Sequence, residues 1–172
     1  IIKLLLNKGI EGRDVMIKAA RHGCDDVCKL LLDRGANIEA TNKYGRTPLI
    51  IAAEEGRKDI CEFLLDKGAN IEATDKYDNT PLIAAAAEGH EDTCKLLLDR
   101  KANIEATSNG GKTALMHAAR HGHKDMCKLL LKRGADVSAK NNCSLTVFDF
   151  DSNGFIFSLL VDIEAENDKS NS

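Results

Sequence analysis

The chain contains no tryptophan and only two prolines, and aromatic residues make up just 4% of its 172 residues. Apolar residues still account for 43%, and the recurring ones are leucine, alanine and isoleucine. A single deep core usually draws on large aromatic side chains, so this composition argues against one. It favours instead a thin apolar seam shared between stacked structural units.

An excess of basic charge and long apolar runs are also missing. The net charge is −3, whereas a nucleic-acid-binding surface needs a basic stripe. No apolar run reaches the ~18 residues that a membrane-spanning helix requires. The sequence has no phosphate-binding glycine loop, nucleophile elbow or zinc-finger spacing. We therefore expect no nucleic-acid partner, no membrane insertion, no cofactor, no metal and no catalytic residue.

Cysteine is present, but its spacing does not suit a disulfide scaffold. Four of the six cysteines recur at one position, 33 residues apart: Cys28, Cys61, Cys94 and Cys127. Equivalent positions in stacked helices lie ~8–10 Å apart, beyond the ~7 Å between Cα atoms that a disulfide tolerates. We expect buried, free thiols that pack as small apolar groups, with a weaker metal-ligand alternative for Cys24 and Cys28. Free thiols indicate a reducing, intracellular compartment, in the first place the cytoplasm.

What the sequence does contain is a period of 33 residues. One threonine position recurs at Thr47, Thr80, Thr113 and Thr146, and a glycine, a cysteine and a leucine pair keep the same step. A period of this length is typical of stacked repeats, in which each unit buries its apolar face only against its neighbours. We predict an all-α repeat solenoid with four full units and partial or capping units at both ends.

The physical logic of one unit is visible in residues 42–74. Thr47 can cap free N–H groups, and Pro48 suits the first position of a helix, so the pair predicts a helix start. The recurring Gly56 position predicts the helix end, because glycine readily adopts the left-handed conformation found there. Asp59 recurs in the first turn of a second helix, where an acid complements the helix dipole. An extended stretch then leads to the next threonine.

These residues carry a family resemblance. Residues Gly45 to Ala53 read Gly-x-Thr-Pro-Leu-x-x-Ala-Ala, and Leu-Leu-x-x-Gly-Ala and Asn/Asp-Ile/Val-x-Ala follow, which resembles the ankyrin repeat. The resemblance covers roughly residues 10 to 145 and implies paired antiparallel helices with outward β-hairpin fingers in a slightly curved solenoid. Where the family often has histidine after Thr-Pro-Leu, this chain has Ile50, Ile83 and Met116, without the hydrogen bonds of that side chain.

The period divides the chain into units. We assign residues 1–9 to the second helix of a truncated repeat and residues 10–41 to a repeat with a shortened finger. Three regular repeats follow at residues 42–74, 75–107 and 108–140. Residues 141–163 form a degenerate C-terminal capping repeat, and residues 164–172 form a polar tail. Seven residues are missing between Gly9 and Gly35, which predicts a short loop over Ile10–Arg13 and an irregular first junction. A start inside a repeat favours a fragment of a longer protein or a missing N-terminal cap.

The repeat decays after Lys140. Four of the five phenylalanines lie there, at positions 148, 150, 155 and 157. A capping repeat is our first interpretation, because a terminal repeat must end the apolar seam. The alternative is a separate hydrophobic docking segment, which would leave the phenylalanines exposed. Beyond Asp162 the chain is acidic and polar, and we expect it to fray.

His121, His123 and Asp125 form the only metal-like cluster in the sequence. Gly122-His123, like Gly89-His90, stands where the ankyrin family usually has a Gly-His pair in the turn between two helices. We therefore interpret these histidines as structural.

The resemblance also suggests where a partner would bind, since ankyrin repeats usually bind through the fingertips and the exposed side of the first helix. That mapping gives the partner-binding candidates Lys43, Tyr44, Arg46, Glu54, Glu55, Lys76, Tyr77, Asn79, Glu88, Lys112, Arg120 and His121. Both tyrosines of the chain fall on adjacent fingertips, and tyrosine is enriched at binding hot spots. The alternative is that duplication copied a solvated Lys-Tyr pair.

The leading function from the sequence is a non-enzymatic protein–protein interaction module, a scaffold, adaptor or inhibitor that acts as a monomer through a rigid concave surface. The alternatives are the targeting arm of a larger enzyme or ubiquitin-ligase adaptor, and a structural spacer. Basic fingertips predict an acidic rim on the partner, and the glutamates beside them predict a basic or amide-rich centre. The partner itself is not specified by the fold.

Overall fold

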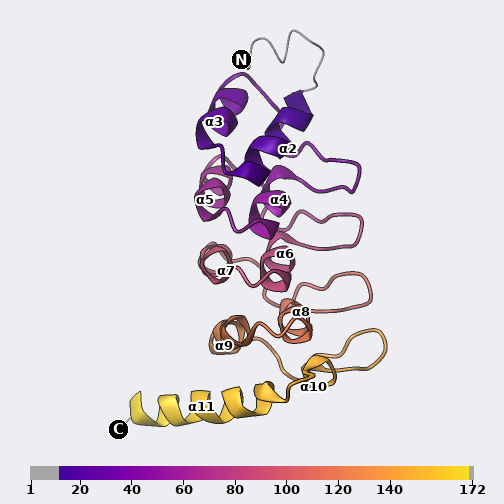
Figure 1. The fold of residues 1–172 in the computed structure, drawn as a ribbon, viewed down its shortest axis with the longest axis vertical. Coiled ribbons are helices and arrows are strands. Elements are labelled where there is room, and N and C mark those ends of the chain that lie inside the picture. The colour runs from indigo at the N-terminus through magenta and orange to yellow at the C-terminus, as the bar shows by residue number, and fades with distance from the viewer. Residues whose placement is uncertain (1–11, 171–172) are drawn as a thin grey trace.

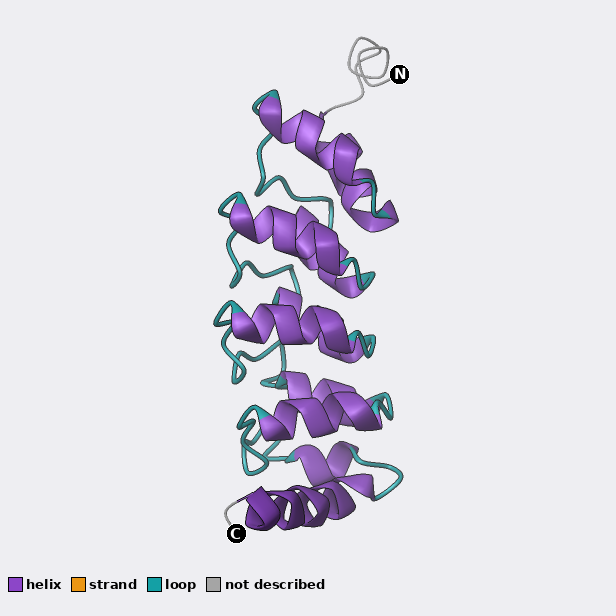
Figure 2. Ribbon diagram, turned by 90° about the vertical axis from the view of Figure 1, so that its left-hand side faces the viewer, coloured by secondary structure: helices purple, strands orange, loops and turns teal. Residues whose placement is uncertain are grey.

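Paired helices are stacked in layers along one axis, and loops project from one side of the stack (Figure 1). The structure is a computed structural model that describes residues 12–170. The truncated helix expected over residues 1–9 therefore lies outside the described residues. The view at right angles shows the helices of each layer lying roughly parallel to those of the next (Figure 2).

The helices form two columns. The first helix of each unit contacts the first helix of the next, and the second helices stack in the same way. The first column contains α2 (Gly12–His22), α4 (Pro48–Glu54), α6 (Pro81–Ala87), α8 (Ala114–Arg120) and α10 (Val147–Phe150). The second contains α3 (Asp25–Asp33), α5 (Lys58–Asp66), α7 (Glu91–Asp99), α9 (Lys124–Lys132) and α11 (Phe155–Ser170). The predicted all-α solenoid is confirmed.

The threonine positions begin the first helices as predicted. The hydroxyl oxygens of Thr47, Thr80 and Thr113 accept hydrogen bonds from the N–H groups three residues later at 3.3, 3.3 and 3.4 Å. Pro48 and Pro81 occupy the first turn, where their missing N–H would have no helical partner anyway. The helices α4, α6 and α8 are only seven residues long, so their stability depends on packing more than on helix propensity.

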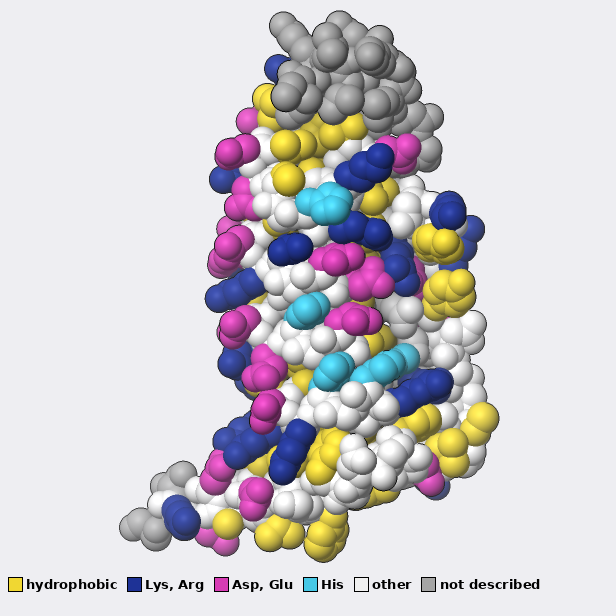
Figure 3. Space-filling model, viewed as in Figure 1, with side chains coloured by type: hydrophobic (Ala, Val, Ile, Leu, Met, Phe, Trp, Pro, Cys, Tyr) yellow, Lys and Arg dark blue, Asp and Glu magenta, His cyan; other side chains and the backbone are white. Residues whose placement is uncertain are grey.

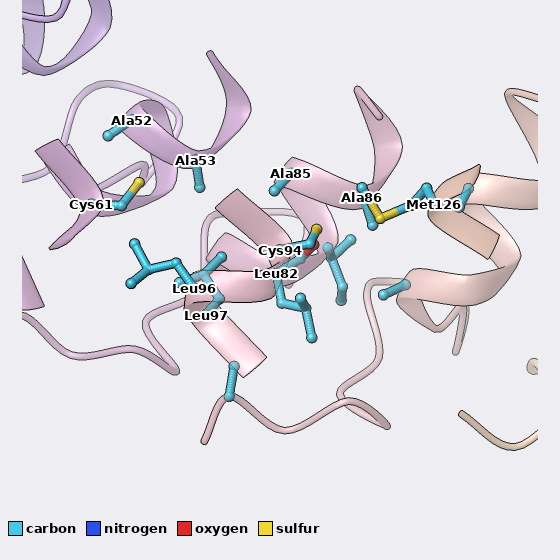
Figure 4. Close-up of a cluster of buried hydrophobic side chains, with 14 of the residues drawn as sticks. Ala52, Ala53, Cys61, Leu82, Ala85, Ala86, Cys94, Leu96, Leu97 and Met126 are labelled. Carbon is cyan, nitrogen blue, oxygen red and sulfur yellow. The ribbon is translucent and has the colours of Figure 1, made fainter. Parts of the chain in front are cut away.

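The core is the continuous seam that the composition suggested. Alanine pairs on the first helices face the cysteines and leucines of the second helices, and all of these side chains are buried (Figure 4). The recurring thiols, Cys28, Cys61, Cys94 and Cys127, are fully buried and unpaired, as predicted. Small side chains at a fixed position let neighbouring helices approach closely, which keeps the seam thin.

The first junction differs from the prediction in one respect. The prediction of a loop over Ile10–Arg13 is wrong for its last two residues, because α2 already begins at Gly12. With eleven residues, α2 is longer than the seven-residue first helices below it. Asp14 consequently lies in the first turn of α2 rather than at a Thr-Pro type of start. An acid in this turn still complements the helix dipole.

The C-terminal end also differs. Expected fraying beyond Asp162 is wrong, because α11 continues to Ser170. Ile156 and Leu159 bury one face of α11 against the stack, as a cap would. Phe148 and Phe157 are 47% and 71% exposed, as the docking alternative expected. The segment thus closes the seam on one side and presents apolar groups on the other.

Candidate binding surface

The twelve candidate residues lie along two adjacent strips of the stack. One strip follows the projecting loops between the layers, which we call the fingers, and the other follows the C-terminal ends of α4, α6 and α8. Hydrophobic side chains lie at the outer edge of the upper fingers, and Lys/Arg and Asp/Glu side chains mix over the helix ends beside them (Figure 3). The structure therefore brings the two strips together as one surface.

Each finger is held by a side chain at its base. Asp75 Oδ1 accepts hydrogen bonds from the N–H groups of Tyr77 and Asn79 at 2.8 and 3.0 Å. Asn42 and Asn141 make the same bonds one repeat earlier and two repeats later. Short polar side chains form such local turns readily, which suits the Asn, Asp or Ser found at positions 42, 75, 108 and 141.

Neighbouring fingers are joined backbone to backbone. Lys76 N–H donates to the Tyr44 carbonyl at 3.0 Å, Asn109 N–H to the Tyr77 carbonyl at 2.8 Å, and Asn142 N–H to the Gly110 carbonyl at 2.9 Å. The hairpins implied by the family contain no strand within residues 12–170, where the one isolated bridge joins Thr107 and Thr113. The fingers nevertheless form a continuous hydrogen-bonded row, which fixes the spacing of their tips.

Both tyrosines project from this row. Tyr44 and Tyr77 are 43% and 53% exposed, and the bond from Lys76 to the Tyr44 carbonyl holds their fingers together. Lys43 Nζ lies 4.9 Å from the centroid of the Tyr44 ring, and the Arg46 guanidinium lies 5.8 Å from it. Cation–π contacts of this kind restrict the ring, so the Tyr44 side chain is partly pre-ordered.

Arg46 spans the groove between finger and helix. Its Nη1 contacts both carboxylate oxygens of Glu54 at 2.8 Å, and its Nε contacts Asp75 Oδ2 at 3.3 Å. The Asp75 side chain is only 1% exposed, and a buried carboxylate requires a cation or several donors. Arg46 therefore has an internal role and does not present the free positive charge that the sequence suggested.

The other charged candidates divide in the same way. Two of the three predicted acidic side chains are paired within the chain. Glu55 pairs with Arg21 at 3.5 Å, and Glu54 pairs with Arg46. Glu88 is exposed and makes no ion pair with any residue from 12 to 170. Lys112 lies over the ring of Phe150 at 5.8 Å.

A hollow of about 160 Å³ opens in the groove beside Arg46. It is lined by four of the predicted residues, Arg46, Glu54, Asn79 and Glu88, and by Ile50, Asp75, Ile83, Ala84, Ala87 and His117. None of this second group is among the twelve candidates. The signal for Asp75 was present, since it is the only acid at a position that is otherwise Asn or Ser. Nothing in the sequence indicated the hollow itself.

His117 is a titratable side chain in the lining that is uncharged near neutral pH. Its Nε2 lies 2.8 Å from Ser108 Oγ. Burial lowers the pKa of His117 to about 4, helped by the positive charges of Lys112 and Arg120. The imidazole is consequently uncharged near neutral pH and adds no positive charge to the groove.

The remaining histidines support the structural interpretation. His90 Nε2 and His123 Nε2 lie 2.9 Å from the carbonyl oxygens of Glu54 and Ala87, each at the end of the preceding first helix. His121 and His123 stack with ring centroids 6.1 Å apart. In the described part of the chain, no group of three His, Cys, Asp or Glu side chains is arranged to hold a metal ion. Arg120 and His121 are exposed at the end of α8, apart from the hollow.

Two stacked columns of helices with a row of fingers define a helical repeat solenoid, a class that binds along an extended surface. A family model described as ankyrin repeats (3 copies) matches residues 1–75 and 70–141, and the chain therefore belongs to the ankyrin-repeat family. Ankyrin repeats are in general protein–protein interaction modules and typically non-catalytic. A search of curated proteins finds no match to this chain.

The described helices include none with the length and apolarity needed to cross a bilayer.

Proposed function

We propose that this chain is a non-enzymatic protein-binding module whose partner lies in the groove between the fingers and the first helices. The observation that carries the proposal is the pair of exposed tyrosines, Tyr44 and Tyr77, on fingers held together by the Lys76 hydrogen bond. Scaffold, adaptor and inhibitor are all compatible roles, because each requires a surface that holds a partner.

The rigidity of this surface supports the proposal. The finger row, the Arg46 contacts and the stacked helices are all formed in the free chain. Binding to a pre-ordered surface loses less conformational entropy than binding that must first order a loop. The exposed charged candidates without an ion pair among residues 12–170 are Lys43, Lys76, Arg120 and Glu88, whereas Arg46, Glu54 and Glu55 are already paired. The partner should therefore offer acids to the two lysines.

The test compares proteins retained from a cell extract by the wild-type chain and by the double variant Tyr44→Ala/Tyr77→Ala. A stoichiometric partner should be retained by the wild type and lost by the variant. Calorimetric titration with the purified partner should then show a loss of about 2 kcal/mol or more for each tyrosine. The free energy of unfolding should change by about 0.5 kcal/mol or less, because both rings are exposed.

Phe157→Ala provides a matched control, since it removes an exposed aromatic ring at the far end of the stack. This variant should retain the partner. Normal binding by the tyrosine double variant would place the site elsewhere on the solenoid. Absence of any stoichiometric partner would support the structural-spacer alternative.

A further inference from the structure

The hollow in the groove arises from a difference between two repeats. In the unit 42–74 the groove is spanned by Arg46 and Glu54. The positions 33 residues later are Asn79 and Ala87, whose short side chains cannot span it. Both line the hollow of about 160 Å³. The hollow thus lies where the second unit lacks the arginine that fills the groove of the first.

The size of the hollow indicates what it can hold. Small-molecule sites usually measure ~300–1,000 Å³, and this hollow is smaller and opens directly into the groove. It suits one side chain of a bound protein better than a free metabolite. Because it adjoins the fingers of Tyr44 and Tyr77 through Arg46 and Asn79, a partner that covers the tyrosines also covers the hollow.

The charge of the lining favours one kind of side chain. Three carboxylates, from Glu54, Asp75 and Glu88, face a single guanidinium, from Arg46. Arg46 contacts Glu54 and Asp75, which leaves Glu88 as the acid without an ion pair among residues 12–170. Since His117 is neutral near pH 7, the lining carries a net negative charge.

The rest of the lining is apolar. Ile50 and Ile83 are 1% exposed and form part of the hollow with Ala84 and Ala87. Lysine and arginine place their methylene stems along apolar surface and keep the charged head beside polar groups. A lining of aliphatic side chains next to an unpaired carboxylate matches both parts of such a side chain.

We propose that this hollow binds one cationic side chain, a lysine or an arginine, of the protein that occupies the groove. The ammonium or guanidinium group pairs with Glu88, and the methylene stem packs on Ile83, Ala84 and Ala87. The incoming cation pairs with an acid whose equivalent in the first unit, Glu55, is already paired with Arg21. This inference rests on the proposed function and adds to it the chemistry of the partner.

The experiment selects binders from a library of random peptides displayed on phage, with the wild-type chain as bait. Recovered peptides should share a lysine or arginine at one position. Replacing that residue by methionine in a synthetic copy of the peptide should weaken binding about 10-fold or more, because removing one member of a desolvated charge pair mainly raises the dissociation rate.

Two protein variants locate that cation. Glu88→Gln should weaken the same peptides about 10-fold and leave the methionine copy unaffected, as expected when both changes remove one pair. Glu55→Gln is the matched control, because Glu55 occupies the same position one repeat earlier, pairs with Arg21 and does not line the hollow. Its effect should be several-fold smaller.

A third variant fills the hollow from within. Asn79→Arg places an arginine at the position equivalent to Arg46, on the lining of the hollow, where it adds both bulk and positive charge. The basic peptides should then bind at least 10-fold more weakly, while thermal unfolding stays cooperative. Asn79→Gln, which lengthens the side chain without adding charge, should retain most of the binding.

The outcomes separate this inference from the proposed function. Peptides that depend on Tyr44 and Tyr77 but carry no common cation, or ignore Glu88→Gln, would overturn the cation site and leave the protein-binding surface intact. Peptides indifferent to both the tyrosines and Glu88, or a selection that yields no binders, would overturn both. Equal loss with Glu88→Gln and Glu55→Gln would reduce the effect to general electrostatics and also overturn the site.

Discussion

At the scale of single residues, the buried thiols behave as core groups. Burial raises the pKa of Cys61 and Cys127 to about 12 and that of Cys28 to about 11, and it raises the pKa of Cys94 as well. The thiolate is the reactive form, so a buried thiol is protected by both its pKa and its lack of access.

Thiol titration of the native protein should therefore detect Cys24 and Cys143, which are exposed. The four buried cysteines should react only after denaturation. Their raised pKa also implies that the native state keeps these protons above pH 9.0, the ordinary value, while the unfolded chain loses them. Stability should fall as the pH rises from there. Rapid native reaction of Cys61 would contradict this account.

Arg46 is the charged residue whose removal should cost the most. In Arg46→Ala, Asp75 loses its cation while its side chain stays buried, although the N–H groups of Tyr77 and Asn79 still donate to it. We expect a loss of about 1–3 kcal/mol in the free energy of unfolding, measured by urea denaturation.

Arg133→Ala is the control, because its ion pair with Asp99 at 2.9 Å is largely solvated. It should cost about 0.5 kcal/mol or less. If the two variants were equally stable, the Arg46 contacts would count only as a surface ion pair.

At the scale of elements, the turn between the two helices of a unit is held by the next unit. Gly89 has a φ of 76°, and a Cβ there would lie 2.8 Å from His123 Nδ1. His123 in turn contacts the Ala87 carbonyl. We expect Gly89→Ala to destabilise the protein by about 2–3 kcal/mol in thermal or urea unfolding, because it adds a clash to the ~1–2 kcal/mol of left-handed strain.

Gly68→Ala separates these two contributions. Gly68 has a similar φ of 87°, yet a Cβ there meets nothing within 4 Å. This variant should lose only the ~1–2 kcal/mol of backbone strain. Equal losses in the two variants would mean that the histidine ring moves aside without cost.

The end of α11 is held to α9 by charge. Lys128 Nζ lies 2.8 Å from Glu166 Oε1, and Lys132 also pairs with Glu166. These lysines lower the pKa of Glu166 to about 2. The stabilisation is therefore present above the ordinary value of 4.5 and is lost as the pH falls toward 2.

Hydrogen exchange should show α11 amides near Glu166 less protected at low pH or high salt, since exposed pairs are screened. Glu166→Gln should produce the same change at neutral pH and remove its pH dependence. Unchanged protection in that variant would show that Ile156 and Leu159 hold the helix without the ion pairs.

At the scale of the whole molecule, each layer contacts only its neighbours, so stability should add up along one dimension. Leu97 in α7 and Leu159 in α11 are both buried, and replacing either by alanine should cost about 2–5 kcal/mol locally. Leu97→Ala should lower hydrogen-exchange protection from α4 to α9. Leu159→Ala should lower it only in α10 and α11. Identical profiles would indicate that the solenoid unfolds as one unit.

The sequence predicted much of this fold because repeat contacts are local in the chain. The Thr47 cap, the buried Cys61 position and the Gly-His turn at Gly89 each follow from residue chemistry within one unit and its neighbour. The two errors in the helix limits, at Gly12 and beyond Asp162, lie at the ends of the stack, where the period no longer constrains where a helix begins or ends. Phe148 and Phe157 show the same limitation, since their exposure depends on what the last layer leaves uncovered.

The sequence by itself thus determined the family, the order of the helices, the buried seam and the position of the tyrosines on adjacent fingers. Only the tertiary structure decided which charges are free. Arg46, Glu54 and Asp75 belong to two repeats and meet across the groove, and the short Asn79 and Ala87 leave the hollow beside them. The 33-residue period shows which residue types the units share at each position. The ion pairs and the hollow depend instead on residues that differ between neighbouring units, and on how those units stack.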